Sequence, residues 1–405
     1  MKILHILAQL PGATGSGVYF ANLIRELERY GHEQAAIFGR QDDCFFPLPL
    51  PSDRQYPVDF KTSDLPFPIP GMSDVMPYDS TRYSAMSPEM MEQWLKAFQS
   101  RLEQAGTDFR PEVLILHHLW ILTSLALDIF PGLKSIGVCH HTDLRQARNN
   151  PSLRERYVNK LHRLTTILSL SDAHQNEIRC LHACAGTKLV TMGGGFDQSL
   201  FFPGPKKRSE GPVRILYAGK IDPSKGVYAL IEAFLALRQA DSDLCLSIVG
   251  SPNTEQAAKL SQLTGGNSSI QLYPAQSQAR LAEIMREHDL FVLPSFFEGL
   301  GLIAIEALAC GLWTVATEIE GLVSLLGERV IQSGAIEFVP LPKMEGPGVP
   351  RESQVGDFVE GLAAKLALQI GRARRGDGFP QGLLDDISRH SWRAIAARIN
   401  AVISD

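Results

Sequence analysis

The chain has 405 residues, of which 44% are hydrophobic, so we expect two domains of roughly 200 residues, each with a buried core. The formal net charge of -5 argues against a general nucleic-acid-binding protein, and no apolar run reaches the ~18 residues of a membrane-spanning helix. The first five residues lead directly into an expected strand without a secretory signal, and the six scattered cysteines fit reduced thiols, so we expect a cytoplasmic protein.

A glycine-rich turn near the amino terminus joins an expected parallel strand at 2–10 to an expected helix at 18–30. The turn includes Gly15, Ser16 and Gly17. Apolar residues recur at helical spacing in the segment that follows, as an amphipathic helix requires. The glycine spacing is not that of the GxGxxG fingerprint, so it gives little support for a dinucleotide site, and an ordinary strand–helix turn is the alternative.

The segment 45–91 differs in character from the regular elements around it. It carries nine prolines, with aromatic residues scattered between polar ones. Proline removes a backbone donor and fixes φ, so this segment is not a regular helix or a central strand. Long ordered loops in compact domains are often functional. We expect either a wall or lid of a binding site, or a passive surface insertion.

Two histidine pairs follow expected parallel strands: His117 with His118, and His140 with His141. Ligands of open α/β sheets bind at the carboxyl ends of the strands, so we expect these side chains to point toward a ligand. Four imidazoles could also gather a zinc ion. No spaced carboxylate or thiolate completes such a set, and paired histidines also occur as plain strand ends.

A polar stretch at 204–212 is the best candidate for a domain boundary. A second α/β domain then begins with an expected strand at 213–218. The loop after this strand carries Lys220 and Lys225 in the stretch Gly-Lys-Ile-Asp-Pro-Ser-Lys-Gly. Two solvated turn lysines are the simplest explanation for either residue alone, but a weak one for both together directly after a strand.

The most informative stretch lies at 290–311. A short apolar strand leads into a glycine turn that begins at Glu298, and strong helix formers follow from Leu302. A helix amino terminus after such a turn directs backbone N–H groups at an anion such as phosphate. A carboxylate accepts hydrogen bonds from vicinal hydroxyls, so Glu298 and Glu306 beside a phosphate suit a sugar nucleotide.

The alternative for the two glutamates is an ordinary strand–helix unit, with Glu298 solvated in the loop and Glu306 on the helix surface. The neighbours of Glu306 argue against it, because residues 303–305 and 307–309 are all apolar. A lone glutamate in such a helix should be paired or functional.

The stretch Glu-Gly-x-Gly-Leu-x-x-x-Glu-Ala-x-Ala-x-Gly, with seven residues between Glu298 and Glu306, resembles the signature of retaining GT-B glycosyltransferases of the family 4 type. Leu300 departs from the phenylalanine that is usual in the family. The resemblance extends in order over most of the chain, and the glycine run at 193–197 is similar to the family's hinge segment.

The resemblance implies an α/β protein of GT-B architecture, with two Rossmann-like domains that face each other across a cleft. On this basis we place an amino-terminal, acceptor-side domain at 1–203, joined by a returning carboxy-terminal helix at 385–405. The nucleotide-sugar (donor) domain is placed at 213–384. The segment 45–91 would then be a wall or lid on the acceptor side.

The resemblance also implies roles for individual residues. Lys220 and Lys225 match the family's G-[RK]-x4-K-G motif, whose cations stabilise the departing nucleoside diphosphate. Lys220 stands where many members carry arginine, so a point charge replaces a planar fork. His141 would face the donor sugar, with His140 as the runner-up. The expected catalytic residues are Lys220, Lys225, Glu298 and His141, and the expected donor-binding residues are Gly15, Ser16, Gly17, Gly250, Tyr273, Gly299, Leu300, Gly301 and Glu306.

The function implied is retaining, metal-independent transfer of a sugar from a nucleotide sugar to an acceptor hydroxyl. We expect no bound metal and no cofactor besides the nucleotide-sugar co-substrate. The acceptor would be a small molecule, a glycan or a lipid-linked compound; a weak peripheral membrane contact and any oligomeric state are left open. The alternatives are a GT-B-fold nucleotide-sugar epimerase or phosphorylase-like enzyme, and a non-catalytic nucleotide-sugar binding protein.

Overall fold

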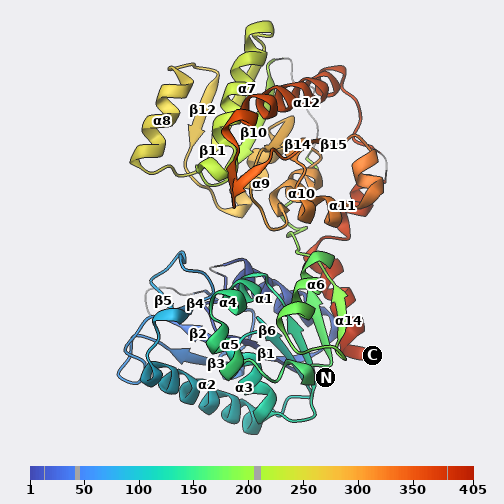
Figure 1. Cartoon of the computed structure of the whole chain (residues 1–405). Helices are drawn as coiled ribbons and strands as arrows, with labels where there is room; N and C mark the ends of the chain where they lie inside the picture. Colours follow the sequence, from blue (N-terminus) through green and yellow to red (C-terminus); the bar gives the residue numbers. More distant parts are fainter. Residues whose placement is uncertain (13, 42–45, 205–210, 381) are drawn as a thin grey trace. The chain divides into compact units, whose positions relative to one another are not determined.

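The computed structural model of the chain divides into two compact α/β units (Figure 1). The first unit comprises Met1–Gly194 and Trp392–Asp405, and the second comprises Gly195–Ser391. Most of the polar stretch expected at 204–212, and Phe45 at the start of the proline-rich segment, lie outside the described residues. The structure describes residues 1–12, 14–41, 46–204, 211–380 and 382–405.

The boundaries between the units differ from the expected ones both where the chain leaves the first unit and where it returns to it. We expected 195–203 in the first domain and 385–391 in its returning segment, whereas both stretches belong to the second unit. The physical reason is burial. Phe196 and Phe201 in one stretch, and Ile387 in the other, pack into the hydrophobic core of the second unit.

The first unit is built on a seven-stranded parallel sheet of order β3-β2-β1-β6-β7-β8-β9. All strands are parallel, but successive strands are added on one side of β1 (β2, β3) and then on the other side, starting with β6. The strand order therefore reverses between β1 and β6. Ligands of open α/β sheets bind beside the carboxyl ends of the strands at such a reversal. The strands are β1 (Lys2–Leu7), β2 (Glu33–Arg40), β3 (Gln55–Asp59), β6 (Val113–His117), β7 (Lys134–Val138), β8 (Thr166–Ser169) and β9 (Lys188–Thr191).

Helices of the first unit include the last helix of the chain, which returns to pack on α1. There the ring of Trp392 meets the ring of Tyr19 edge to face, with 4.9 Å between centroids. Within the described residues, every helix is too short or too polar to span a bilayer. The helices are α1 (Gly15–Leu27), α2 (Pro88–Asp108), α3 (Ile121–Ile129), α4 (Thr142–Asn149), α5 (Pro151–Tyr157), α6 (Asp172–Leu181) and α14 (Trp392–Ser404).

The second unit has a six-stranded parallel sheet of order β12-β11-β10-β13-β14-β15. Its strand order reverses between β10 and β13. The strands are β10 (Val213–Ala218), β11 (Leu244–Val249), β12 (Ile270–Tyr273), β13 (Leu290–Leu293), β14 (Trp313–Thr317) and β15 (Ile336–Val339). The helices are α7 (Val227–Ala240), α8 (Thr254–Thr264), α9 (Gln278–Arg286), α10 (Leu302–Ala309), α11 (Glu320–Gln332), α12 (Val355–Arg375) and α13 (Leu383–Ser388).

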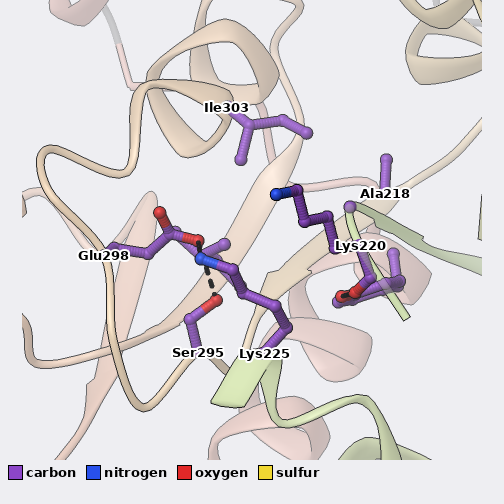
Figure 2. A pocket seen from close by; sticks show the side chains of 9 residues that line it. Ala218, Lys220, Lys225, Ser295, Glu298 and Ile303 are labelled. Atoms are coloured by element: carbon purple, nitrogen blue, oxygen red, sulfur yellow. Dashed lines mark hydrogen bonds and ion pairs between the residues drawn. The ribbon is translucent and has the colours of Figure 1, made fainter. Parts of the chain in front are cut away.

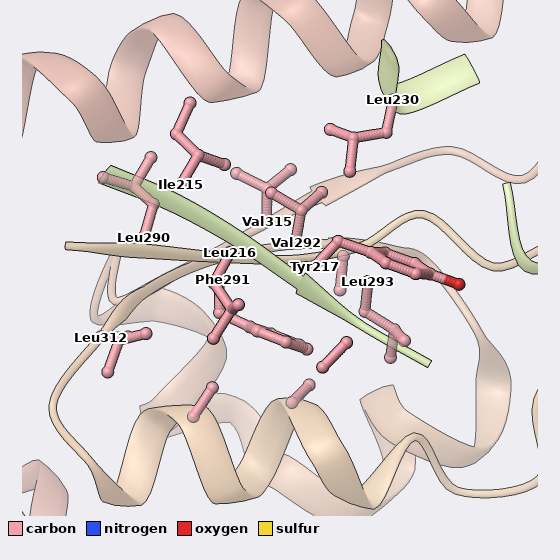
Figure 3. Packing of buried hydrophobic residues seen from close by; sticks show 14 of the residues in the cluster. Ile215, Leu216, Tyr217, Leu230, Leu290, Phe291, Val292, Leu293, Leu312 and Val315 are labelled. Atoms are coloured by element: carbon pink, nitrogen blue, oxygen red, sulfur yellow. The ribbon is translucent and has the colours of Figure 1, made fainter. Parts of the chain in front are cut away.

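The two central strands of the second sheet are mostly apolar, with the exposed Arg214 of β10 as the exception. Ile215 and Leu216 of β10 and Leu290 and Phe291 of β13 are all fully buried, with helices over both faces of the sheet (Figure 3). Continuous apolar runs are what a parallel strand needs when both of its faces are covered. The loops that follow β10 and β13 therefore start from positions that the core holds fixed.

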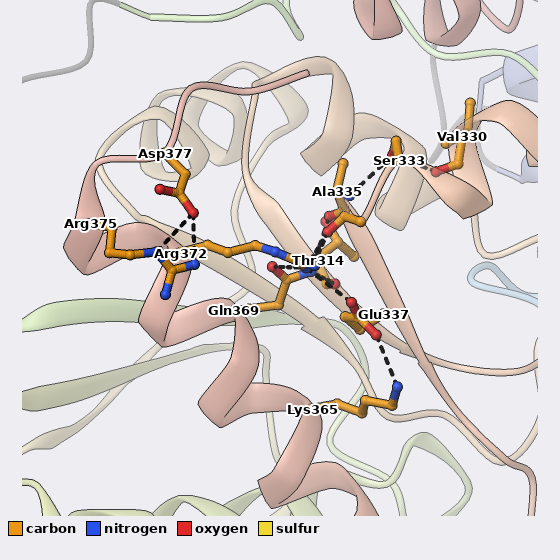
Figure 4. Close-up of polar contacts among 11 residues, drawn as sticks. Thr314, Val330, Ser333, Ala335, Glu337, Lys365, Gln369, Arg372, Arg375 and Asp377 are labelled. Carbon is orange, nitrogen blue, oxygen red and sulfur yellow. Dashed lines mark hydrogen bonds and ion pairs between the residues drawn. The ribbon is translucent and has the colours of Figure 1, made fainter.

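A polar clamp fastens α12 to this sheet (Figure 4). The buried side-chain amide of Gln369 donates a hydrogen bond to the carbonyl oxygen of Thr314 at 3.1 Å. Glu337 of β15 accepts hydrogen bonds from Lys365 at 2.9 Å and Arg372 at 3.0 Å. Burial opposes ionisation of Glu337, but these two hydrogen bonds outweigh it and lower its pKa. The clamp thus satisfies polar groups that helix–sheet packing would otherwise leave buried and unpaired.

Two small two-stranded elements and the short 3₁₀ helices complete the fold. The pair in the first unit is parallel and the pair in the second is an antiparallel hairpin. The pairs are β4 (Pro70–Gly71) with β5 (Thr81–Arg82), and β16 (Met344–Gly346) with β17 (Val349–Pro350). The 3₁₀ helices are η1 (Glu28–Tyr30), η2 (Ser52–Arg54), η3 (Tyr83–Ala85), η4 (Leu161–Arg163), η5 (Pro223–Lys225) and η6 (Glu352–Gln354).

The proline-rich segment 45–91 is partly built into the core of the first unit. Its residues 55–59 form β3 at the edge of the sheet, where proline is tolerated. Phe60, Phe67 and Tyr83 are buried in the same hydrophobic cluster as the central strands. Much of the segment therefore has a packing role, which neither of the two expectations for it included.

Candidate active site

The loop between β10 and α7, residues 219–226, is the lysine loop of the second unit. Asp222 shapes it, because its carboxylate accepts hydrogen bonds from the backbone N–H of Ser224 at 2.9 Å and from the Ser224 hydroxyl at 2.5 Å. Gly226 ends the loop with φ of 66°. A β-carbon at Gly226 would lie 1.9 Å from the carbonyl oxygen of Pro294, so only glycine lets the neighbouring loop approach this closely.

The loop between β13 and α10, residues 294–301, is the glutamate loop. Gly301 adopts the left-handed conformation, with φ of 61°, and begins α10. Gly299 lies against α11, because a β-carbon at Gly321 would stand 2.0 Å from the Gly299 carbonyl oxygen. Leu300 is buried, with 8% of its surface exposed. The glycines thus permit close backbone packing, and Leu300 is buried at the position where the resembled family usually has phenylalanine.

Direct hydrogen bonds join the lysine loop to the glutamate loop. The backbone N–H of Phe296 donates to the carbonyl oxygen of Ser224 at 2.8 Å. The ammonium group of Lys225 donates to the Phe297 carbonyl at 2.9 Å and forms an ion pair with Glu298 Oε1 at 2.7 Å. These contacts make the two loops one structural unit at the reversal of strand order.

Together these loops line a partly open cavity of about 270 Å³ at the carboxyl ends of β10 and β13. The ion pair of Lys225 with Glu298 lies in its wall, and the hydroxyl of Ser295 donates to Glu298 Oε1 at 3.1 Å (Figure 2). Lys220 extends into the same space beside Ile303 (Figure 2). The lining residues are Tyr217, Ala218, Gly219, Lys220, Lys225, Leu293, Ser295, Glu298 and Ile303.

Tyr217, near the end of β10, holds the lysine loop in place. Its hydroxyl donates a hydrogen bond to the backbone carbonyl of Lys220 at 2.6 Å. Burial, followed by the nearby charge of Glu298, raises the pKa of Tyr217, so the phenol keeps its proton at neutral pH. The hydrogen bond therefore fixes the backbone from which the Lys220 side chain extends.

Glu306 lies inside α10 and is buried, with 9% of its surface exposed. Burial raises its pKa to about 8. Among the described residues, none donates a hydrogen bond to its carboxyl group or forms an ion pair with it. A buried carboxyl without a protein partner is costly unless a ligand completes it, which keeps Glu306 a candidate for recognition of hydroxyls.

Gly250 and Tyr273, both predicted from the sequence, lie next to the lysine loop. The backbone N–H of Gly250 donates to the Tyr273 carbonyl at 2.9 Å. A β-carbon at Gly250 would lie 2.4 Å from the carbonyl oxygen of Gly219. Tyr273 has 39% of its surface exposed. The expected site residues of the second unit thus lie at or after the carboxyl ends of four neighbouring strands, β12, β11, β10 and β13, with Glu306 in the helix that follows β13.

The predicted glycine turn of the first unit lies at the start of α1. Thr14 caps this helix by accepting a hydrogen bond from the backbone N–H of Gly17 at 3.1 Å. A β-carbon at Gly17 would lie 2.6 Å from the carbonyl oxygen of Leu10, so glycine is needed for close packing. Ser16 is buried beside Gln9, to which its hydroxyl donates at 3.3 Å, whereas Gly15 is exposed.

The histidine pairs of the first unit, which we expected to point toward a ligand, are largely buried. His117 and His118 are each 2% exposed, and His140 is 9% exposed. His117 Nδ1 and His140 Nε2 share a hydrogen bond of 3.2 Å between stacked rings. The reason is coverage by α1, because Tyr19 packs edge to face on both rings. His141 alone of the four is partly open.

The zinc alternative for these histidines finds no geometric support in the part of the chain that the structure describes. There, no three side chains of His, Cys, Asp or Glu gather in a way that could hold a metal ion. His117, His118 and His140 instead lie against one another and against aromatic rings. Burial is the first cause that lowers the pKa of each of them.

Residues 201–341 match the family described as "Glycosyl transferases group 1". The matched segment contains both the lysine loop and the glutamate loop. The chain is also 26% identical over 255 residues to D-inositol 3-phosphate glycosyltransferase 2 of Catenulispora acidiphila, covering 59% of this chain and 55% of that protein. Alignments with this and similar curated relatives cover between 33% and 57% of the length of those proteins.

Two solved structures share the fold over the whole chain. Sucrose-phosphate synthase of Thermosynechococcus elongatus superposes with a TM-score of 0.67 at 15% identity, covering 100% of this chain and 98% of that one. A protein of Anabaena solved in complex with UDP and glucose gives a TM-score of 0.59 at 16% identity, covering 99% of each chain. The predicted fold class, an α/β protein with two Rossmann-like domains of the GT-B class, is confirmed by these likenesses.

Sequence reasoning missed three residues of the site: Ser295, Tyr217 and Asp222. Ser295 binds the carboxylate of Glu298, Tyr217 holds the Lys220 backbone, and Asp222 shapes the lysine loop. The pattern Asp-Pro-Ser could have revealed Asp222, since Asp before Pro favours the start of a turn. The other two act across the fold, and no local spacing marks them.

Proposed function

We propose that this chain is a glycosyltransferase that moves a sugar from a nucleotide-sugar donor to an acceptor hydroxyl, with retention of the anomeric configuration and without a bound metal ion. The proposal depends most on one observation. At the strand reversal of the second unit, two lysines and a glutamate line a single cavity that is held by interlocked loops.

The two cations suit the chemistry of the leaving group. When the bond between the anomeric carbon and the diphosphate oxygen breaks, negative charge grows on the nucleoside diphosphate. Lys220 and Lys225 would stabilise that charge, together with the backbone N–H groups at the start of α10. Both lysines are held before the donor binds: Tyr217 holds the backbone of Lys220, and the glutamate loop holds the side chain of Lys225. Such preorganisation lowers the reorganisation needed in the transition state.

Retention requires no protein nucleophile in this proposal. The acceptor oxygen attacks the anomeric carbon on the face that the diphosphate leaves, and the leaving phosphate oxygen takes the acceptor proton. The new glycosidic bond and the proton transfer therefore balance the broken phosphate ester bond. Glu298 would bind hydroxyls of the donor sugar while Ser295 and Lys225 hold its carboxylate in place.

The remaining expected contacts divide between the two units. Glu306 would accept hydrogen bonds from the ribose hydroxyls, and Gly250 and Tyr273 would lie beside the base. In the first unit, the turn at 15–17 would approach the diphosphate, and His141 would face the donor sugar. The acceptor would be a small molecule, a glycan or a lipid-linked compound, bound by the first unit, and the enzyme would act in the cytoplasm.

The main rival is a protein that binds a nucleotide sugar without turning it over. Binding alone needs less positive charge at the leaving group than the pair Lys220 and Lys225 supplies. An epimerase or a phosphorylase-like enzyme is the second rival. A phosphorylase would need a pyridoxal lysine or a seat for free phosphate, and the sequence offers no further motif for either.

A thermal-shift panel tests the proposal directly. Nucleotide sugars with uracil, guanine, adenine or thymine bases, and the matching bare nucleotides, are added to the whole chain, because a ligand that binds only the native state raises the melting temperature. We expect one nucleotide sugar to stabilise the protein and to undergo transfer or slow hydrolysis. Stabilisation without any sugar transfer or hydrolysis, across a broad set of acceptors, would support the non-catalytic rival instead.

A further inference from the structure

Two histidines of the first unit have unusual backbone conformations. His118, directly after β6, has φ of 74°, and His141, after β7, has φ of 69° and ψ of -38°. Residues other than glycine rarely adopt positive φ, because the β-carbon then crowds the backbone. Such strain persists only where the surrounding structure holds it, and it gathers at functional sites.

The side chain of Asp143 connects the two strained residues. This aspartate is fully buried, with 0% of its surface exposed. Its Oδ2 accepts a hydrogen bond of 2.7 Å from the backbone N–H of Leu119, the residue directly after His118. Its Oδ1 accepts one of 3.1 Å from the backbone N–H of His140, the residue directly before His141. A single carboxylate therefore ties together the ends of β6 and β7.

Further hydrogen bonds complete the environment of this carboxylate. The backbone N–H of Leu144 and the thiol of Cys139 donate to Oδ1 at 3.2 and 3.4 Å, and the His140 N–H is also 3.3 Å from Oδ2. Hydrogen bonds to a carboxylate in a buried site are stronger than those between neutral groups. The Asp143 carboxylate thus accepts enough hydrogen bonds to remain buried and to hold both loops.

The strained backbone sets the place of the His141 imidazole. That ring stacks on the ring of His174, with 4.6 Å between centroids and 29° between planes. We call the hydrogen bonds of Asp143 to the ends of β6 and β7 the Asp143 clamp. On the β6 side of this clamp, the His118 peptide is held as well, since its N–H donates to the Val138 carbonyl and its carbonyl accepts from the Thr123 hydroxyl. His141 is the partly open member of this group, so its ring is the one that a ligand can reach.

We propose that Asp143 is a positioning residue, whose carboxylate holds His118 and His141 in their positive-φ conformations and so presets the His141 imidazole on His174. The fixed position of the His141 ring is a property of the ligand-free chain and follows from the contacts described above. Its consequence for the donor sugar rests on the proposed function.

The first test is an NMR measurement on Asp143→Asn. Asparagine keeps the size of the side chain, but one acceptor oxygen becomes an NH2 donor that faces backbone N–H groups. Stacked rings shift each other's proton resonances, so the His141 ring protons have displaced chemical shifts in the native chain. We expect these shifts to move toward the values of an unstacked histidine in Asp143→Asn. Unchanged His141 shifts in a folded variant would overturn the proposal.

Leu102→Ala is the matched control for stability. Leu102 is fully buried in the core of the first unit, on α2, and has no part in the clamp. Its removal should lower the melting temperature while the His141 shifts stay at their native values. The control separates a general loss of stability from a loss of positioning.

Two further measurements keep the proposal testable if Asp143→Asn does not fold. In the native chain, the amide hydrogens of Leu119 and His140 should exchange slowly with solvent, and rapid exchange would contradict the clamp. His118→Gly should also be more stable than His118→Ala by about fivefold or more in the unfolding equilibrium constant, because only glycine is free of strain there. Equal stabilities would show that His118 is not strained.

Kinetic and binding measurements test whether the position of His141 matters for transfer of the donor sugar. With the nucleotide sugar identified by thermal shift, Asp143→Asn should lower kcat at least tenfold while affinity for the matching nucleoside diphosphate stays within twofold. Displaced His141 shifts with unchanged turnover would leave the positioning intact and reject the role of His141 in the proposed function. Native shifts with reduced turnover would reject the positioning role of Asp143.

Discussion

The strand reversals of the two units differ in what fills them. In the first unit, the ring of His117 at the end of β6 lies 5.0 Å from Phe20 and 6.1 Å from Tyr19, both on α1. In the second unit, the same position in the topology is a cavity of about 270 Å³ lined by Lys225 and Glu298. A shared arrangement of parallel strands therefore supports a closed aromatic cluster in one unit and an open charged site in the other.

This comparison shows that the covering helix, as well as the strand order, decides whether a reversal can bind a ligand. Helix α1 places bulky side chains over β6, whereas Gly226 starts α7 and lets the lysine loop lie directly against the glutamate loop. Burial also shifts the pKa values of ionisable groups in opposite directions in the two units. Burial lowers the pKa of His5 and His118 to about 4, and raises that of Glu306 to about 8.

The largest expected effect concerns the charged site of the second unit. Lys225→Ala should lower turnover about a hundredfold to a thousandfold, which is typical for loss of one preorganised group that stabilises transition-state charge. Donor affinity should fall much less, because the charge grows only as the sugar bond breaks. Lys220→Arg should be milder, since the positive charge remains. Turnover and donor affinity are measured for each variant.

Lys365→Ala is the matched control, because it also removes a lysine–glutamate ion pair, Lys365 with Glu337 at 2.9 Å, but neither residue lines the cavity. It should leave turnover near that of the native chain. If Lys225→Ala reduces affinity and turnover by the same factor, Lys225 is only a binding contact, and the enzymatic proposal loses its main support.

The second prediction tests the buried histidines of the first unit. Their folded-state pKa values lie below the unfolded value of about 6.5, so the unfolded chain binds protons first as pH falls. Stability is therefore complete above pH 6.5 and is lost between 6.5 and about 4. The loss is at most about 1.4 kcal/mol per pH unit for each such histidine. Hydrogen exchange at pH 7 and pH 5 measures it in the first unit.

His5→Gln should reduce this pH dependence, because His5 is fully buried and contributes to it. His162→Gln, at an exposed position, should leave it unchanged. A pH dependence that is the same in the native chain and in His5→Gln would mean that His5 takes up no extra proton on unfolding.

A smaller effect is expected from Glu306 in the second unit. Its folded pKa of about 8 lies above the unfolded value of about 4.5, so its contribution to stability is complete below pH 4.5 and is lost as pH rises through 8. Hydroxyl recognition needs the charged form, so nucleotide affinity should rise with pH, by at most about tenfold per unit below pH 8. Calorimetric titration between pH 6.5 and 9 measures this rise.

Glu306→Gln should abolish the rise in affinity and should make the protein more stable at pH 8. Glu352→Gln, at an exposed position, is the control and should change neither property. An affinity for nucleotide that Glu306→Gln leaves unaltered at every pH would rule out Glu306 as a ribose contact.

The smallest expected effect is that of a chelator. If Lys220, Lys225 and the start of α10 supply the positive charge, excess chelator should leave turnover unchanged within error. Activity that disappears with chelator and returns with magnesium or manganese would reject the metal-free mechanism. It would also mean that the second unit alone does not supply the charge that catalysis needs.

Much of the second unit could be predicted from the sequence because its signals are local. The apolar run at 290–293, the turn from Glu298 and the helix from Leu302 follow one another within twenty residues, and the structure has β13, the glutamate loop and α10 there. The lysine loop directly follows β10 in the same way. What the sequence could not supply is the hydrogen bond of Ser295 or Tyr217, since each depends on two loops brought together by folding.

The first unit was harder to predict, because its features depend on distant contacts. The rule that strand ends face a ligand suggested that His117 and His118 point toward one, but it does not say that Tyr19 and Phe20 of α1 cover the His117 ring. The proline content of 45–91 correctly excluded a regular helix, yet gave no sign that Phe60 and Phe67 would enter the core. Strain at His141 is likewise invisible in sequence, because nothing local distinguishes it from an ordinary turn residue.

The contact between Gly226 and the Pro294 carbonyl has a practical consequence for protein engineering. Because 1.9 Å would separate a β-carbon at Gly226 from that oxygen, the loops at 219–226 and 294–301 fit together only as a matched pair. A chimera that takes one loop from a relative and keeps the other would combine two shapes that were never selected together. Loops exchanged between relatives at this position should therefore be transplanted together, with both segments replaced in one step.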